Sequence, residues 1–525
     1  MVVSVSPPGT DVGLQVLKQG GNAVDAAVAT AFALAVTWPE AGNIGGGGFM
    51  LVYPGGKVDP VLIDYRETAP GAATREMFPK DFNGYGCTAV GVPGTVRGMA
   101  LAHEKFGKLP WKALVMPAVQ LAEEGFLLDA ATAASLNKVV TSARDFPELQ
   151  RVFGKDGGKE VWRSGDRLVQ KDLGKTLRLI AEQGPDAFYK GAIAEQFVAE
   201  MKAGSGLITR EDLAGYRAHA RVPIRGTYRG LDIYAPPPPS SGGIGLVQML
   251  NVLENFDLKK QGRGSPETLH LMIETMRRAY CDRARHLGDS DFVKIPAHLT
   301  TKEYARELAR SIDLKKATPS ETLARDIPLS DESDSTTHFS VVDRDGMAVS
   351  NTYTLEHSYG ARVVVRGAGF LLNNEMMDFN RRPGVTTRSG IIGTAPNLIA
   401  PGKRMLSSQT PTVVARDGKA VLVTGSPGGR TIINTVLCVV VNVVDFDMDI
   451  QAAVDAPRLH QQWFPDQARF EGNTAQPELV EKLRSMGHTI VGSRQGDAHS
   501  IWIDPRTGRF HGAADRRISG KAAGY

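Results

Sequence analysis

The chain has 525 residues, of which 42% are hydrophobic and 22% are charged, as is typical of a soluble globular protein with a sizeable core. The formal net charge is only +4 and no Lys/Arg-rich run stands out, so nucleic-acid binding has no support. Three widely spaced cysteines, Cys87, Cys281 and Cys438, indicate neither a disulfide framework nor a metal motif.

The apolar segments disfavour two further classes, membrane-spanning proteins and proteins with a signal peptide. The longest apolar run, residues 436–444, is interrupted by Asn442 and is too short to cross a bilayer, so we expect no membrane span. Residues 1–8 lack the basic and long apolar segments of a signal peptide. As written, the sequence therefore predicts a cytoplasmic protein, unless a leader lies outside this numbering.

The N-terminal region predicts a helix followed by a hairpin. Asn22 is a suitable cap for a helix over residues 23–36, whose many Ala and Val residues indicate burial on most sides. Four glycines at 45–48 precede strands at 49–53 and 61–63. No Lys-Ser/Thr pair and no helix follow the glycines, so the run favours close backbone packing beneath a site over a phosphate loop.

Arg66 stands at the end of the second of these strands. A buried arginine needs a partner, and two interpretations remain open. It forms a structural ion pair, or it is a bidentate clamp for the carboxylate of a substrate.

Residues from about 90 to 330 are predicted to be mainly helical. A strand at 228–234 leads into a Pro-rich turn at 236–243 and a helix at 244–255. Residues 266–312 are helical and Arg-rich, which is more typical of a solvated face than of a ligand site. After about residue 312 the chain becomes polar, and this stretch is the best linker candidate.

Beyond the linker, hairpins with Gly-containing turns alternate with helical segments such as 432–446. Together with the hairpin at 49–63, this pattern predicts an α+β fold. It has two antiparallel sheets faced by helices, a four-layer αββα sandwich, and an additional helical portion before the linker.

Thr336 begins a predicted strand directly after the linker, and the chain returns as a second strand ending at Thr354. An ordinary strand-start threonine is one interpretation. The other is an N-terminal nucleophile: if the Ser335–Thr336 bond is cut, the α-amino group of Thr336 becomes the base for its own hydroxyl. Thr354, which equally suits a packed strand, lies where it could hydrogen-bond this nucleophile.

The segment 424–431 joins a predicted strand to a predicted helix. Gly428 and Gly429 there expose backbone N–H groups at the helix N-terminus, which is the geometry of an oxyanion hole; a plain tight turn is the alternative.

Two further segments offer groups for a small ligand. Glu375 and Asp378 are three residues apart and can face one side of a turn, as suits an ammonium ligand or a solvated surface. Ser407 and Ser408 could donate hydroxyls to a carboxylate. With Arg66, this set is typical of recognition of an α-amino acid head group.

The sequence at this point closely resembles the γ-glutamyltranspeptidase (glutathione hydrolase) family, in the same order along nearly the whole chain. The matching motifs are GGNAVDAA at 20–27, GGGGFM at 45–50, DYRETAP at 64–70, PPSSGG at 238–243, TTH at 336–338, LNN at 372–374, LSS at 406–408 and GSPGG at 425–429.

The resemblance implies an N-terminal-nucleophile hydrolase fold and self-cleavage into a large subunit, 1–335, and a small subunit, 336–525, that form a heterodimer. It implies a γ-glutamyl ester on Thr336, formed from glutathione or another γ-glutamyl compound. The acyl group then passes to water or to an acceptor amino acid or peptide. It implies no cofactor and no metal, and bacterial members are often periplasmic or secreted.

The resemblance also implies residue roles. Thr354 supports the nucleophile, and the N–H groups of Gly428 and Gly429 form the oxyanion hole. The α-carboxylate of the head group would be held by Arg66, Ser407 and Ser408. The α-amino group would be held by Glu375 and Asp378.

One position departs from the family pattern. Glu356 stands where the family usually has an asparagine that helps to bind the α-amino group. Three acids around one ammonium repel one another unless one is protonated or turned away. An acylase of the same scaffold that takes glutaryl-type acyl groups therefore stays open as an alternative. A separate alternative is an uncleaved homologue that binds ligands without catalysis.

Overall fold

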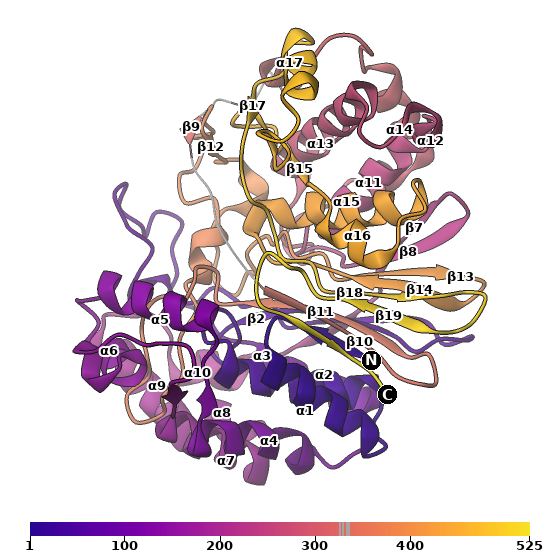
Figure 1. Ribbon diagram of the computed structural model, residues 1–525. Helices are drawn as coiled ribbons and strands as arrows, with labels where there is room; N and C mark the ends of the chain where they lie inside the picture. The colour runs from indigo at the N-terminus through magenta and orange to yellow at the C-terminus, as the bar shows by residue number, and fades with distance from the viewer. Residues whose placement is uncertain (325–326, 328–329, 332–336) are drawn as a thin grey trace.

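The computed structural model describes residues 1–324, 327, 330–331 and 337–525. Two antiparallel sheets stack face to face at its centre (Figure 1). The first sheet has, in spatial order, β20 (Lys521–Ala523), β1 (Val2–Ser4), β10 (Thr337–Val342), β11 (Ala348–Thr354), β2 (Gly47–Tyr53), β3 (Val61–Asp64) and β6 (His219–Arg221). The second has β19 (Phe510–Ala513), β18 (Ser500–Ile503), β14 (Lys419–Thr424), β13 (Thr412–Arg416), β8 (Leu231–Ala235) and β7 (Ile224–Tyr228).

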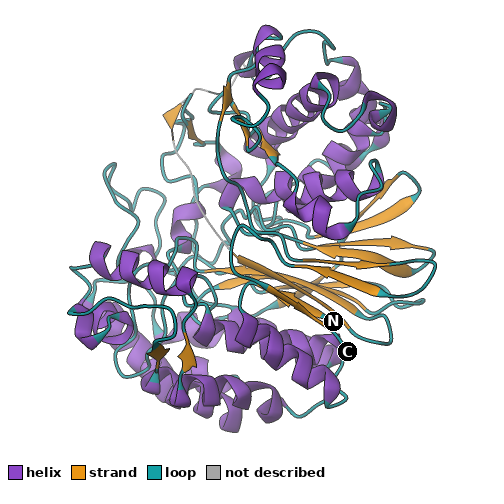
Figure 2. Cartoon of the chain, in the orientation of Figure 1, coloured by secondary structure: helices purple, strands orange, loops and turns teal. Residues whose placement is uncertain are grey.

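Helices cover the outer face of each sheet, as Figure 2 shows. On the first sheet lie α1 (Pro7–Lys18), α2 (Ala23–Thr37) and α3 (Thr95–Phe106), and α4 (Trp111–Glu124) packs behind α2. On the second lie α11 (Gly242–Leu253), α15 (Ile432–Val444) and α16 (Ile450–Asp455), and α13 (Pro266–His286) and α14 (Lys302–Arg310) pack behind α11. The predicted four-layer αββα sandwich is confirmed.

The remaining helices extend these outer layers. Beside the first sheet are α5 (Ala130–Ser142), α6 (Pro147–Phe153), α7 (Lys171–Gln183), α8 (Asp186–Lys190), α9 (Ala192–Ala203) and α10 (Arg210–Gly215); beside the second are α12 (Leu258–Gln261) and α17 (Pro477–Ser485). Small sheets pair β4 (Phe126–Leu127) with β5 (Arg167–Leu168), β9 (Ser330–Asp331) with β12 (Gly390–Ile391), and β15 (Leu459–His460) with β16 (Ala468–Phe470) and β17 (Ile490–Val491). In the part of the chain that the structure describes, no helix is both long and apolar enough to cross a membrane.

Strand β2 contributes side chains both to the core between the two sheets and to the core beneath the helices. Its alternate residues Phe49 and Leu51 pack between the sheets, whereas Met50 and Val52 point to the helical layer on the other side. All seven residues of β2 are buried, because side chains alternate between two faces that are both covered. A continuous apolar run in this strand is therefore what a central strand of the sandwich requires.

Helix α2 has the cap and the burial that its sequence predicts. The Asn22 side chain accepts a hydrogen bond from the N–H of Asp25, and the Asp25 carboxylate accepts one from the N–H of Asn22. All 15 residues of the helix are buried. The Ala- and Val-rich composition follows from this position beneath the first sheet.

One predicted strand is partly wrong. Of residues 228–234, those from Leu231 onward lie in β8 as predicted, but Tyr228 ends β7, and Arg229 and Gly230 form the turn between the two strands with φ of 49° and 77°. Gly230 adopts this left-handed conformation at little cost. The apolar and aromatic residues on both sides of the turn obscured it, because each belongs to a different strand.

The sheet core offers a direct test of this architecture. Phe49→Ala removes a fully buried ring between the sheets and should lower the free energy of unfolding by about 3–5 kcal/mol. Urea unfolding followed by circular dichroism measures the change. Phe292→Ala, at a ring that is 49% exposed, is the matched control and should cost less than about 1 kcal/mol. Equal losses in the two variants would contradict the placement of β2.

Candidate active site

The predicted cleavage pair, Ser335 and Thr336, lies outside the residues that the structure describes. Strand β10 begins at the next residue, and Thr337 pairs with Tyr353 of β11. Thr354 follows Tyr353 at the end of β11, and its buried hydroxyl oxygen accepts a hydrogen bond of 2.7 Å from the N–H of Glu356. The predicted hairpin is confirmed, and it brings Thr354 to the same end of the sheet as the start of β10.

The glycine run at 45–48, which leads into β2, provides close backbone packing beneath this end of the hairpin, as the sequence predicts. A Cβ atom on Gly46 would lie 2.0 Å from the carbonyl oxygen of Thr354, and one on Gly45 would lie 2.2 Å from that of Leu371. The Asn373 side chain donates to the Gly45 carbonyl at 2.8 Å and accepts from the N–H of Glu375 at 3.0 Å. The run therefore positions the turn that carries Glu375.

Arg66 follows β3 and is fully buried. Its guanidinium donates to the carboxylates of Glu375 and Asp378, and its Nε donates to the Met405 carbonyl at 3.3 Å. Its Nη1 also lies 3.5 Å from a carboxylate oxygen of Glu67. The ion pair that the sequence left open is thus present, and it joins segments more than 300 residues apart.

The three acids form one cluster. Glu375 and Asp378 lie in a single 3₁₀ turn, as their spacing predicts, and Glu356 lies two residues after Thr354 with φ of 75°. One carboxylate oxygen from each comes within 4.8 Å of the others. These oxygens could receive a cation, and Arg66 already supplies a positive charge to two of the three carboxylates, those of Glu375 and Asp378.

The charge state of this cluster is set by burial. Burial raises the pKa of Glu375 to about 7, against the opposing effect of Arg66. Burial, and then the charge of Glu375, raise the pKa of Glu67 well above its usual range. Although burial acts in the opposite direction, Glu375 and Asp378 hold the pKa of Arg66 above its ordinary value. The acid cluster, taken together with Arg66 and Glu67, therefore carries one fixed positive charge. At neutral pH it carries fewer negative charges than its number of carboxyl groups suggests.

Ser407 and Ser408 reach the cluster from a segment held by the Pro-rich turn. The Ser407 N–H donates to the Pro239 carbonyl at 2.8 Å, and its own carbonyl accepts from the N–H and the hydroxyl of Ser241. The hydroxyl oxygen of Ser408 accepts a bond of 3.1 Å from the guanidinium of Arg283. The Pro-rich motif thus has a structural role next to the site.

Arg283 was missed by sequence reasoning, because the Arg-rich helix α13 was interpreted as a solvated face. That interpretation is wrong for this helix. Arg277 and Arg278 are only 2% and 3% exposed and pair with Glu274 inside the protein, while Arg283 donates to Ser241 and Ser408. The carboxylate three and four residues before these arginines, Glu274, was the available signal.

Gly428 and Gly429 form the turn between β14 and α15. Their φ angles are 126° and 55°, and a Cβ atom on Gly428 would lie 2.5 Å from the hydroxyl oxygen of Thr431. The Gly428 carbonyl accepts from the N–H and the hydroxyl of Thr431, which fixes the turn. The turn faces the cluster, since Gly429 lines the same pocket.

A single pocket collects most of the predicted site residues. Its lining is Arg66, Glu356, Glu375, Asp378, Ser407, Ser408, Gln409, Gly429, Arg430 and Ile432. Six predicted head-group residues are therefore brought together with one predicted oxyanion glycine, from both sides of the linker. Gln409, Arg430 and Ile432 carried no signal in the sequence.

Comparison with known proteins identifies the family. The γ-glutamyltranspeptidase family model matches residues 9–525. The chain is 47% identical to the glutathione hydrolase proenzyme of Escherichia coli K12, over all of this chain and 92% of that protein. It is 38% identical to the acylase ACY 1 proenzyme of Pseudomonas sp. SE83, over 99% of this chain and 92% of that protein.

A solved structure agrees with this result. The cephalosporin acylase of Bacillus halodurans superimposes with a TM-score of 0.87 at 28% identity, covering 100% of this chain and 95% of that one. The N-terminal-nucleophile hydrolase fold and the enzyme class predicted from the sequence, a self-processing γ-glutamyltranspeptidase, are both confirmed. The chain belongs to the γ-glutamyltranspeptidase family.

Proposed function

We propose that the chain cleaves itself between Ser335 and Thr336 into a large subunit, 1–335, and a small subunit, 336–525, which remain a heterodimer. The Thr336 hydroxyl attacks the Ser335 carbonyl carbon, the peptide C–N bond breaks, and water hydrolyses the resulting ester. The arrangement of strands supports a stable heterodimer. In the first sheet β10 lies between β1 and β11, and in the second β13 lies beside β8, so each sheet combines strands from both subunits.

The freed Thr336 then acts on γ-glutamyl amides such as glutathione. Its α-amino group, with an ordinary pKa near 8, accepts the hydroxyl proton as the oxygen attacks the γ-carbonyl carbon. The C–N bond breaks, the amine leaves with a proton, and a γ-glutamyl ester remains. Water then gives glutamate, or an acceptor amino acid or peptide gives a new γ-glutamyl amide. Thr354 orients the nucleophile, and the N–H groups of Gly428 and Gly429 stabilise the oxyanion.

The main observation in support of the proposal is a pocket in which hydrogen-bond donors and carboxylates lie side by side. Arg66, Ser407 and Ser408 offer hydrogen-bond donors to an α-carboxylate, while the acids of the cluster accept from an α-ammonium. A zwitterionic head group matches both halves, because each of its charges meets the opposite charge. No cofactor takes part in any of these steps.

A second candidate is an acylase for glutaryl-type groups, which the acylase relatives and the acid Glu356 bring into consideration. A glutaryl group has no ammonium, so it could not donate to the carboxylates of Glu356, Glu375 and Asp378. The α-ammonium of a γ-glutamyl group adds charge-assisted hydrogen bonds to these acceptors, so the cluster favours the γ-glutamyl group.

Processing is tested with Thr336→Ala. Because Thr336 supplies the nucleophile, the wild type should give fragments of about 36 and 20 kDa, the shares of 335 and 190 residues in a 56.5 kDa chain of 525 residues. The variant should stay at full length and turn over no γ-glutamyl anilide. Thr336→Ser, which keeps a hydroxyl, is the matched control and should still process. Gel electrophoresis and N-terminal sequencing report the outcome; a full-length wild type would favour the non-catalytic alternative.

The head-group assignment predicts a pH dependence. With the pKa of Glu375 near 7, its carboxylate is ionised at pH 8 and largely protonated at pH 6, so affinity for an α-ammonium is lost as the pH falls. The inhibition constant of L-glutamate should rise about tenfold between these pH values. Glutarate, which lacks the ammonium, should show no such rise. Glu375→Gln should flatten the glutamate profile; an unchanged profile in that variant would refute the assignment.

Donor choice separates the two candidate functions. The wild type should prefer a γ-glutamyl anilide to the glutaryl anilide by about 10- to 100-fold in kcat/KM, the effect of one to two charge-assisted hydrogen bonds to the ammonium. Glu356→Asn retains one hydrogen-bond acceptor but loses the charge, so it should reduce this preference without reversing it. A wild type that favours the glutaryl anilide would establish the acylase instead.

A further inference from the structure

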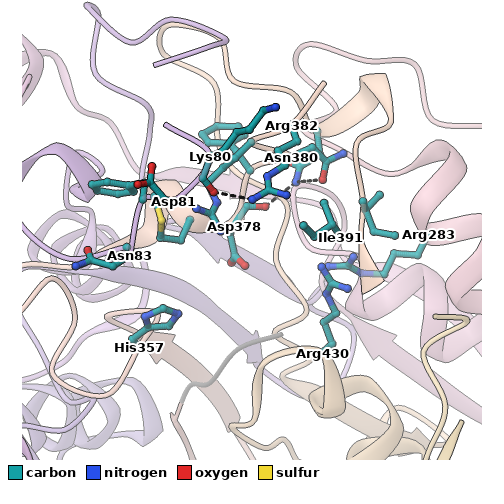
Figure 3. A pocket seen from close by; sticks show the side chains of 17 residues that line it. Lys80, Asp81, Asn83, Arg283, His357, Asp378, Asn380, Arg382, Ile391 and Arg430 are labelled. Atoms are coloured by element: carbon teal, nitrogen blue, oxygen red, sulfur yellow. Dashed lines mark hydrogen bonds between the residues drawn. The ribbon is translucent and has the colours of Figure 1, made fainter. Parts of the chain in front are cut away.

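A second, larger hollow adjoins the head-group pocket and shares Asp378 and Arg430 with it (Figure 3). It has a cavity volume of about 530 Å³, which is within the range of small-ligand sites. We call it the basic groove. Five cationic side chains line it, against the two carboxylates of Asp81 and Asp378. The five are Lys80, Arg283, Arg381, Arg382 and Arg430.

Two of these cations, Arg283 and Arg430, have only neutral partners. Arg283 donates to the hydroxyls of Ser241 and Ser408 at 2.9 and 3.1 Å, and Arg430 donates to the Gly390 carbonyl at 2.6 Å. Neither forms an ion pair within the described ranges 1–324, 327, 330–331 and 337–525. In Figure 3 the two guanidinium groups lie side by side at one wall of the groove.

Their proximity is electrostatically unfavourable without an anion. Burial, and then the charge of Arg430, lower the pKa of Arg283 to about 10. A planar guanidinium matches a carboxylate in a bidentate geometry, and a desolvated carboxylate is stabilised strongly by two such groups. The pair is therefore suited to a carboxylate that arrives with a ligand.

The position of Arg430 in the chain indicates which part of the ligand carries this carboxylate. Arg430 directly follows Gly429, which we propose as an oxyanion donor, so it lies next to the carbonyl group that reacts. The head group of the donor is accommodated by the acid cluster and Arg66 on the other side of Asp378. A ligand that extends from the acyl group into the basic groove presents its amine half to Arg283 and Arg430.

We propose that Arg283 and Arg430 bind a carboxylate on the amine half of the reaction, so that the enzyme selects leaving groups and acceptors that carry a free carboxylate. This inference rests on the proposed function. The leaving amine departs when the γ-glutamyl ester forms, and the entering amine attacks when that ester breaks. Both amines occupy the same position next to the γ-carbonyl group, so one subsite serves both. Lys80 and Arg382, at the other wall of the groove, add to the attraction for anionic ligands.

The test compares ligands that differ only in this carboxylate. As donors, glutathione is compared with its C-terminal carboxamide; as acceptors, glycylglycine is compared with glycylglycinamide. The wild type should prefer each carboxylate form by about tenfold in kcat/KM, and the preference should shrink as NaCl rises from about 0.05 to about 0.5 M. The donor arm reports the leaving group, and the acceptor arm reports the entering amine.

Arg430→Gln should bring both preferences close to one. Arg416→Gln removes the same charge from an exposed position at the end of β13, outside both pockets, and should keep the wild-type preferences. If Arg430→Gln fails to fold, Arg382→Gln serves as the second variant and should weaken the preferences and their salt dependence in part. Equal turnover of carboxylate and carboxamide by the wild type would overturn this inference while the proposed function stands. Turnover of neither donor would overturn both.

Discussion

The side chain of Arg66 lies at the end of β3 with no exposed surface, and a guanidinium in that position must find compensating charge. Glu375 and Asp378 supply it from the other side of the linker, and Glu67 adds a nearby carboxyl group whose pKa burial raises well above its usual range. Because removal of either partner leaves a buried charge, the pairing ties β3 to the 3₁₀ turn that carries the acids. The pocket is a consequence of this requirement.

The head-group pocket and the basic groove, which meet at Asp378, differ in the charge of the side chains that line them. Carboxylates gather with Arg66 in the small pocket, whereas the basic groove beyond Asp378 holds Arg283 and Arg430, which donate hydrogen bonds to neutral hydroxyl and carbonyl oxygens. A ligand with a zwitterionic head and an anionic tail is complementary to both. Both sheets take strands from each side of the linker, so a cut there leaves the hydrogen-bonded layers, and with them the separation of charge, in place.

Much of this could be predicted from the sequence because the signals are local. The Asn22 cap, the hairpin of β10 and β11 and the shared turn of Glu375 and Asp378 depend on neighbours within a few residues. The αββα layers follow from the alternation of buried hairpins and buried helices. The motifs that resemble the γ-glutamyltranspeptidase family identified the class, and the family match confirms it.

Other features depend on contacts that no local pattern contains. The hairpin at Arg229 and Gly230 was hidden because apolar residues on both sides of a turn resemble one strand. Arg283 appeared solvated, since helical spacing defines a face of α13 but not what covers it. Most of the elements, the family and the residue types of the site follow from the amino-acid sequence alone. The pairing of Arg66 with the acids and the convergence of Arg283 and Arg430 emerge only in the folded chain, because burial and long-range proximity set the charge of each group.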